Sequence, residues 1–175
     1  IITKQMKKVN TPALLIIILM SIFMVGSIWN NSATMDELAH IPAGFGYVTQ
    51  GDYRLNPEHP PLIKTISALS GWIFTRPHFP TYTSYWKDDV NGQWAQGTAF
   101  LYESGNNADR IIFWSRMPLI IITALFGLFF FVWTKKKYGT RVAYPALLFF
   151  AFSPTILAHS PLVTTDAAAM IGFFL

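Results

Sequence analysis

The most constraining feature of this sequence is a series of apolar runs that are long enough to cross a lipid bilayer. The first extends from Pro12 to Trp29 and has two serines as its only polar side chains. Two further runs cover 111–133 and 142–157. A helix needs about 20 apolar residues to cross about 30 Å of hydrocarbon, where it must satisfy its own backbone hydrogen bonds. We therefore predict an all-α, multi-pass transmembrane protein whose first span is about 12–30.

The composition agrees with this class of protein. Hydrophobic residues make up 52% of the chain and charged residues 13%, whereas soluble domains have about 25% charged residues. The chain has no cysteine, which excludes disulfides and thiolate metal sites. A cleaved signal peptide is the alternative for the first run, but no small-residue cleavage pattern precedes Asn30. Because the chain starts at Ile1 and stops inside an apolar run at Leu175, we expect an N-terminal fragment of a larger protein.

The distribution of charge predicts the topology. Three lysines precede the first run, and 135–141 contains four basic residues and no acid. Cytoplasmic loops carry an excess of Lys and Arg, so both segments are predicted on the cytoplasmic side. The large loop 31–109, with eight acids and four bases, and the short loop 159–165 then lie on the outer side. A fourth helix is expected to start at about Asp166.

An acidic motif, Asp36-Glu37 with His40, directly follows the first span. Thr34 followed by Glu37 matches a capping box, which predicts a helix start near Met35. A carboxylate beside low-dielectric material can act as a general base, although acids in a first helical turn also simply favour the helix dipole. Glu37 and His40 also match half of a metal site, so a membrane metalloprotease that uses Asp36, His40 and Glu58 is one alternative.

A second motif, Asn56-Pro57-Glu58-His59-Pro60-Pro61-Leu62, is stiffened by its prolines. A rigid polar loop at a membrane surface suits recognition of a ligand headgroup, such as a phosphate bound by His59 and Lys64. The alternative interpretation is a rigid connector between two helices. A helix that begins near Pro61 is expected to lie in the membrane interface, because it has an apolar stripe at Leu62, Ile66, Leu69 and Ile73.

Asp166 is the only acid in residues 110–175. It could cap a helix beside Thr164 and Thr165, but its predicted depth in the membrane favours a functional role. A transporter or channel whose outer acids bind a cation is a further alternative. That alternative predicts acids deep within helices, whereas the acids here lie at the ends of the expected helices.

The order of these motifs resembles the GT-C glycosyltransferases over residues 12–175. These residues form a first span, an Asp-Glu pair, a Pro-Glu-His-Pro-Pro-Leu run and a Thr-Thr-Asp at the fourth helix. Within that fold the sequence is most similar to the protein O-mannosyltransferase and aminoarabinose (lipid A) transferase branch, also described as dolichyl-phosphate-mannose-protein mannosyltransferase-like. The resemblance implies inverting transfer of a sugar from a polyprenyl-phosphate donor to a protein, lipid or glycan acceptor on the outer face.

The resemblance also implies roles for individual residues. Asp36 matches the acid that activates the acceptor hydroxyl, with Glu37 beside it, and Asp166 matches a second acid of the same cavity. Glu58 and His59 stand where the aminoarabinose branch has Glu-Lys, so His59 would replace a basic phosphate contact. This departure makes aminoarabinose a less favoured sugar. Lys64 and His40 complete the expected donor-phosphate-binding residues.

The resemblance sets the expected ligands and location. The resemblance establishes no cofactor, but some members use a divalent metal ion, for which Glu58 or His59 would be a ligand. The expected partners are the polyprenyl-phosphate-linked sugar, the acceptor and the lipid bilayer, with no nucleic acid. The protein would lie in the plasma membrane of a prokaryote or the endoplasmic reticulum of a eukaryote, with its active site on the extracytoplasmic face.

Overall fold

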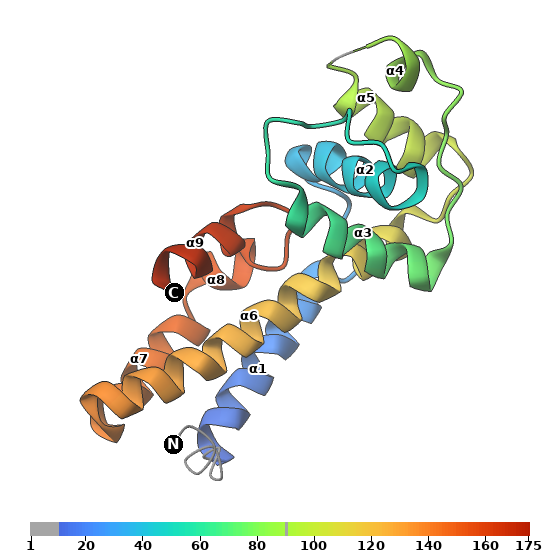
Figure 1. The fold of residues 1–175 in the computed structure, drawn as a ribbon. Coiled ribbons are helices and arrows are strands. Elements are labelled where there is room, and N and C mark those ends of the chain that lie inside the picture. The colour runs from blue at the N-terminus through green and yellow to red at the C-terminus, as the bar shows by residue number, and fades with distance from the viewer. Residues whose placement is uncertain (1–10, 90) are drawn as a thin grey trace.

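The computed structural model describes residues 11–89 and 91–175, and every regular element in those ranges is a helix. The prediction of an all-α chain is therefore confirmed for the described residues. Figure 1 shows the elements in chain order. They are α1 (Thr11–Ile28), α2 (Met35–Gln50), α3 (Pro61–Thr75), α4 (Ser84–Lys87), α5 (Gln93–Thr98), the π-helix η2 (Ala99–Glu103), α6 (Ala108–Tyr138), α7 (Thr140–Ala151), α8 (Pro154–His159) and α9 (Asp166–Phe174).

The helices form two packed groups. Helices α1, α6 and α7 lie against one another, and α2 to η2 form a head at the end where α1 finishes and α6 begins (Figure 1). The long helices share one buried apolar cluster, and the head has its own. The first cluster includes Met20, Met24, Ile120 and Leu147, and the second includes Ile41, Phe45, Phe100 and Ile112.

Two described helices, α1 and α6, are long and apolar enough to cross a membrane. Only 28% of the residues in the most apolar window of α1, and 39% of those in α6, are buried within the protein. Both helices therefore present much of their apolar surface outward. The first predicted span agrees with α1 to within about two residues, which is the usual uncertainty of helix ends. Helix α6 extends beyond the predicted 111–133 at both ends.

The apolar run 142–157, predicted as one span, is divided into α7 and α8. Ser153 between them has a ψ of 122°, which is outside the helical range. The cause is Pro154, because a proline disfavours the helical conformation of the residue before it. The 12 residues of α7 reach only about 18 Å at 1.5 Å per residue. Helix α9 starts at Asp166, as predicted.

Close backbone contacts hold α2 between α3 and α5. Pro42 has no N–H to donate, so it leaves the carbonyl of Leu38 without its helical partner. Gly97 of α5 packs against that carbonyl, where an added Cβ would lie 1.8 Å from the oxygen. On the α3 side, a Cβ at Gly44 would lie 2.2 Å from the carbonyl oxygen of Lys64. The two glycines therefore allow helix approaches that no larger residue permits.

Helix α3 buries its small and polar face and exposes its apolar one. The buried side chains are Ile63, Lys64, Ser67 and Ala68, together with Gly71. Leu62, Leu69, Ile73 and Phe74 are exposed. The predicted apolar stripe thus points away from the core, except for Ile66, which is half-buried.

Candidate functional site

The centre of the candidate site is the carboxylate of Glu37, whose side chain is fully buried. Glu37 is in the first turn of α2, which starts at Met35 as the capping pattern predicts. Its Oε2 accepts hydrogen bonds from the backbone N–H of Thr34 at 2.9 Å and from the Thr34 hydroxyl at 3.1 Å. Its Oε1 accepts one from the backbone N–H of Val163 at 2.9 Å.

Arg116 of α6 completes this arrangement. Its Nε donates to Oε1 of Glu37 at 2.8 Å, and its Nη2 donates to Oε2 at 2.6 Å. The guanidinium also donates to the carbonyls of Asn31 and Ser32 at 3.1 and 2.9 Å. Only 1% of Arg116 is exposed. We call Glu37, Arg116 and the backbone of Val163 the clamp, because it joins α2, α6 and the loop before α9.

The electrostatics of the clamp favour an ionised Glu37. Burial alone would raise the pKa of this carboxyl group. The hydrogen bonds and charge of Arg116, with the N–H groups of Thr34 and Val163, outweigh burial and hold the pKa below its ordinary value. All the acceptor positions of a carboxylate are thereby occupied. Glu37 has no free lone pair with which to accept a substrate proton.

His40, one helical turn after Glu37, binds the same residue of the loop. Its Nδ1 lies 2.8 Å from the carbonyl oxygen of Val163, so this nitrogen carries the proton and donates it. Burial lowers the pKa of His40, and His59 and Lys64 lower it further, against the effect of the Val163 bond. The neutral form of His40 is thus favoured. Glu37 and His40 together bind both backbone polar groups of Val163.

The two other predicted catalytic acids, Asp36 and Asp166, lie beside the clamp and are exposed. Asp36 immediately precedes Glu37, and Asp166 follows Val163 by three residues. The Asp166 carboxylate accepts a hydrogen bond from the Thr164 hydroxyl at 3.3 Å. Within 11–89 and 91–175, neither acid is part of an ion pair. Unlike Glu37, both carboxylates are open to a ligand.

The loop that contains Glu58 and His59 lies on the other side of His40. The His40 and His59 rings meet edge to face, with their centroids 5.0 Å apart. Oε1 of Glu58 accepts hydrogen bonds from the side-chain amides of Asn56 and Gln93, each at 2.9 Å. The bond from Gln93 is the main cause of a lowered pKa of Glu58. The His59 side chain is exposed.

Lys64 lies beneath this loop and is 1% exposed. Its ammonium group donates to the carbonyl and the side-chain oxygen of Asn56 at 2.6 and 2.9 Å, and to the carbonyl of His59 at 2.8 Å. Burial lowers the pKa of Lys64 to about 8, against the charge of Glu58. Because an ammonium group has three donors, Lys64 has none left for a phosphate. It supports the loop from below.

Sequence reasoning identified most of this cluster but missed three participants. The structure connects Glu37, His40, His59 and Lys64 through shared contacts, with Asp36 next to Glu37, and the clamp joins the Asp166 loop to them. The missed participants are Arg116, Gln93 and the backbone of Val163. The sequence did contain a signal for Arg116, because an arginine inside an apolar run costs free energy unless it is paired.

A metal site would need a convergent set of ligands. No group of three or more His, Asp or Glu side chains comes together in the described part of the chain in a way that could hold an ion. Glu58 and His59 are adjacent, but Oε1 of Glu58 is already occupied by Asn56 and Gln93. The described residues therefore do not by themselves form the ligand set that a divalent metal would require.

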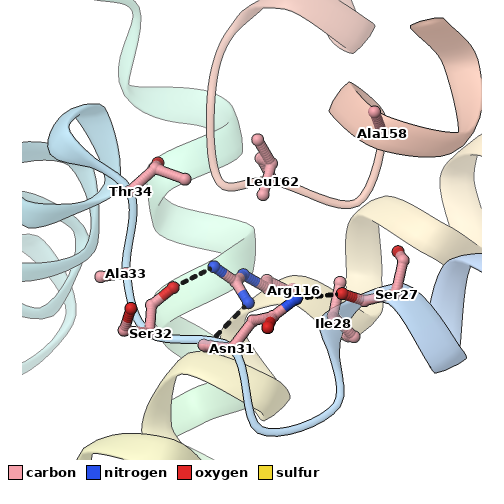
Figure 2. Close-up of a pocket in the computed structure, with 9 residues that line it drawn as sticks. All are labelled: Ser27, Ile28, Asn31, Ser32, Ala33, Thr34, Arg116, Ala158 and Leu162. Atoms are coloured by element: carbon pink, nitrogen blue, oxygen red, sulfur yellow. Dashed lines mark hydrogen bonds between the residues drawn. The ribbon is translucent and has the colours of Figure 1, made fainter. Parts of the chain in front are cut away.

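A groove of about 420 Å³ lies beside the clamp, between the end of α1 and the segment 158–162. Figure 2 shows Arg116 at this groove, bonded to the backbone of Asn31 and Ser32, with Leu162 and Ala158 opposite. The side-chain amide of Asn31 donates to the carbonyl of Ser27, which closes the end of α1. The groove is lined by both apolar and hydroxyl-bearing side chains.

No known protein family, characterised protein or solved structure gave a significant match to this chain.

Proposed function

We propose that this protein is a multi-pass membrane glycosyltransferase. In this proposal it moves a sugar from a polyprenyl-phosphate donor to a hydroxyl group of a protein, lipid or glycan acceptor, on the outer face of the membrane. The observation that carries the proposal is the double attachment of Val163 to α2. It connects the loop before Asp166 to the helix that contains Asp36, so two exposed acids lie on either side of one anchored residue.

The outward apolar surfaces of α1 and α6 support insertion in a bilayer. Trp114 and Trp133 of α6 are about 28 Å apart along the helix at 1.5 Å per residue, close to the hydrocarbon thickness of about 30 Å. Tryptophans favour both membrane interfaces. Lys137 lies over the Trp133 ring at 5.0 Å, at the end of α6 that is remote from the head (Figure 1). This arrangement supports a cytoplasmic lysine end and an outer head.

In the proposed reaction, Asp36 is the general base. It takes the proton of the acceptor hydroxyl while the hydroxyl oxygen forms a bond to the anomeric carbon of the sugar. The bond between that carbon and the donor phosphate oxygen breaks, and its electron pair leaves with polyprenyl phosphate. Attack from the face opposite the phosphate inverts the anomeric configuration. Asp166 is proposed to orient the acceptor or the sugar from the other side of the clamp.

The remaining residues have supporting roles in this proposal. Exposed His59 donates a hydrogen bond to the departing phosphate, on a loop held by Lys64 from below. Glu37 and His40 are positioning residues, since the oxygens of Glu37 and Nδ1 of His40 are already occupied. Asp36 therefore remains the proposed base, and Glu37 beside it has no lone pair available for that role.

The test is sugar transfer in proteoliposomes with radiolabelled polyprenyl-phosphate-mannose and a crude acceptor mixture. Asp36→Asn should reduce transfer by about a hundredfold or more, the usual contribution of a general base. The matched control is Asp88→Asn, which changes an exposed acid of the head that makes no side-chain hydrogen bond or ion pair in the described part of the chain. Full transfer by Asp36→Asn, or no transfer by the wild type from any polyprenyl-phosphate sugar, would contradict the proposal.

A further inference from the structure

A second cavity, of about 190 Å³, lies between the end of α3 and the start of α6. Its walls are basic and polar, and they include Arg76, Arg110 and the segment 105–107. It shares no residue with the candidate functional site. It is smaller than the roughly 300–1,000 Å³ of sites that enclose a whole small molecule, so it suits a single small group.

Two arginines determine the charge of this cavity. The Arg76 guanidinium stacks on the Trp72 ring at 3.7 Å from its centroid, and Nη2 of Arg110 lies 3.5 Å from the carbonyl oxygen of Phe74. The ion pairs within 11–89 and 91–175 are Arg54–Asp52 and Arg116–Glu37. Neither cavity arginine is therefore neutralised there, not even by the adjacent Asp109. Two such guanidinium groups favour a phosphate.

The two helices that line this cavity also have exposed apolar side chains. Leu69, Ile73 and Phe74 of α3 are exposed. The Phe74 ring stacks on Trp114 of α6 at 3.9 Å between centroids. Apolar side chains of α6 continue outward from this level along the helix, with Ile121 and Leu125 exposed. The cavity thus lies where exposed apolar side chains of α3 and α6 adjoin two arginines that form no ion pair within 11–89 and 91–175.

We infer that this cavity binds the phosphate group of an anionic membrane phospholipid, whose acyl chains lie along the exposed apolar residues of α3 and α6. The continuity of the apolar surface with the arginines favours a lipid as the source of the phosphate. The inference is independent of the proposed sugar transfer, because it involves none of the residues assigned to that reaction.

Native mass spectrometry of the protein, delipidated in detergent and mixed with phosphatidylglycerol or phosphatidylcholine, tests the inference. The wild type should bind phosphatidylglycerol more tightly than phosphatidylcholine. Arg76→Gln with Arg110→Gln should weaken phosphatidylglycerol binding about tenfold, since two charge-assisted hydrogen-bonding groups are lost. Arg141→Gln is the control, because it removes an exposed arginine in the first turn of α7, which follows the end of α6 that is remote from the cavity. Thermal unfolding in detergent checks that both variants are folded.

Equal binding of the two lipids, or unchanged phosphatidylglycerol binding by the folded double variant, would overturn the inference. Inorganic phosphate provides the second arm of the experiment. If phosphate alone displaces the lipid at concentrations that match its own binding, the cavity is a site for free phosphate and the lipid assignment is wrong. Retention of the lipid in excess phosphate supports a lipid site.

Discussion

Arg116, in the long apolar helix α6, forms a two-point ion pair with Glu37, which lies 79 residues earlier in the first turn of α2. Both side chains are almost entirely removed from solvent. Both carboxylate oxygens of Glu37 accept further hydrogen bonds, from the backbone N–H groups of Thr34 and Val163. The ion pair therefore connects α6 to the first turn of α2 and, through Val163, to the loop that precedes Asp166.

The clamp should be essential to stability. Glu37→Ala leaves Arg116 buried without its counterion, which should reduce the free energy of unfolding by about 3–5 kcal/mol. Thermal unfolding of the purified protein in detergent measures the change. The matched control is Asp52→Ala, which breaks the partly exposed pair with Arg54 and should cost about 1 kcal/mol or less. Equal losses in the two variants would show that the clamp contributes no more to stability than a partly exposed ion pair.

The close crossing of α2 and α5 should make Gly97 intolerant of a side chain. Gly97→Ala places a methyl group against the carbonyl of Leu38, and such overpacking typically costs about 1–3 kcal/mol or more. The control is Gly26→Ala in α1, where an added Cβ meets nothing within 4 Å. That change should be neutral or slightly stabilising, because alanine favours a helix. Comparing the two melting temperatures tests the crossing.

His40 should make stability depend on pH. Burial lowers its pKa below the ordinary value of 6.5, so the unfolded chain binds a proton more readily than the folded one. Stability should therefore fall as the pH decreases from 6.5 towards the lowered pKa, with no contribution above 6.5 where both states are neutral. The groups that act on His40 are Val163, His59, Lys64 and Asp36.

The measurement is the melting temperature between pH 7 and pH 5. His40→Asn keeps an N–H donor near Val163 but removes the titration, so it should flatten the decline. His78→Asn changes an exposed histidine and should leave the profile unaltered. An identical decline in wild type and His40→Asn would assign it to other groups.

Lys64 should act on the candidate site through the loop above it. Lys64→Met removes three donors to Asn56 and His59, and buried acceptors left without partners cost about 1–3 kcal/mol. Amide hydrogen exchange in 56–59 should accelerate, and the KM for the polyprenyl-phosphate donor should rise. Lys87→Met, at an exposed lysine of the head, should change neither. Unchanged exchange in Lys64→Met would mean that the loop holds its conformation without this support.

The positions of the helices were largely predictable because they depend on local rules. Thr34 and Glu37 predicted the start of α2, Pro61 the start of α3, and Asp166 the start of α9. There are two exceptions. Pro154 divides the apolar run 142–157, predicted as one span, into α7 and α8. The short helices α4, α5 and η2 lie in a segment for which the sequence predicted no helix. The sequence also showed the outward apolar stripe of α3, since a stripe follows from the helical period alone.

The functions of neighbouring charged residues depended on the tertiary structure. Asp36, the predicted base, and Glu37 beside it are both candidate catalytic acids in the sequence, but successive residues of a helix point about 100° apart. Only the tertiary structure, which brings Arg116 of α6 and the 160–165 loop to the first turn of α2, decides that Glu37 is bound by Arg116 while Asp36 remains exposed. Lys64 is likewise a candidate phosphate ligand in the sequence. The fold places its ammonium group beneath the 56–59 loop, where all three of its donors are used. The ends of helices follow from residues that are neighbours in the sequence. The burial of a side chain and its hydrogen-bonding partners depend on residues that the fold brings together from far along the chain.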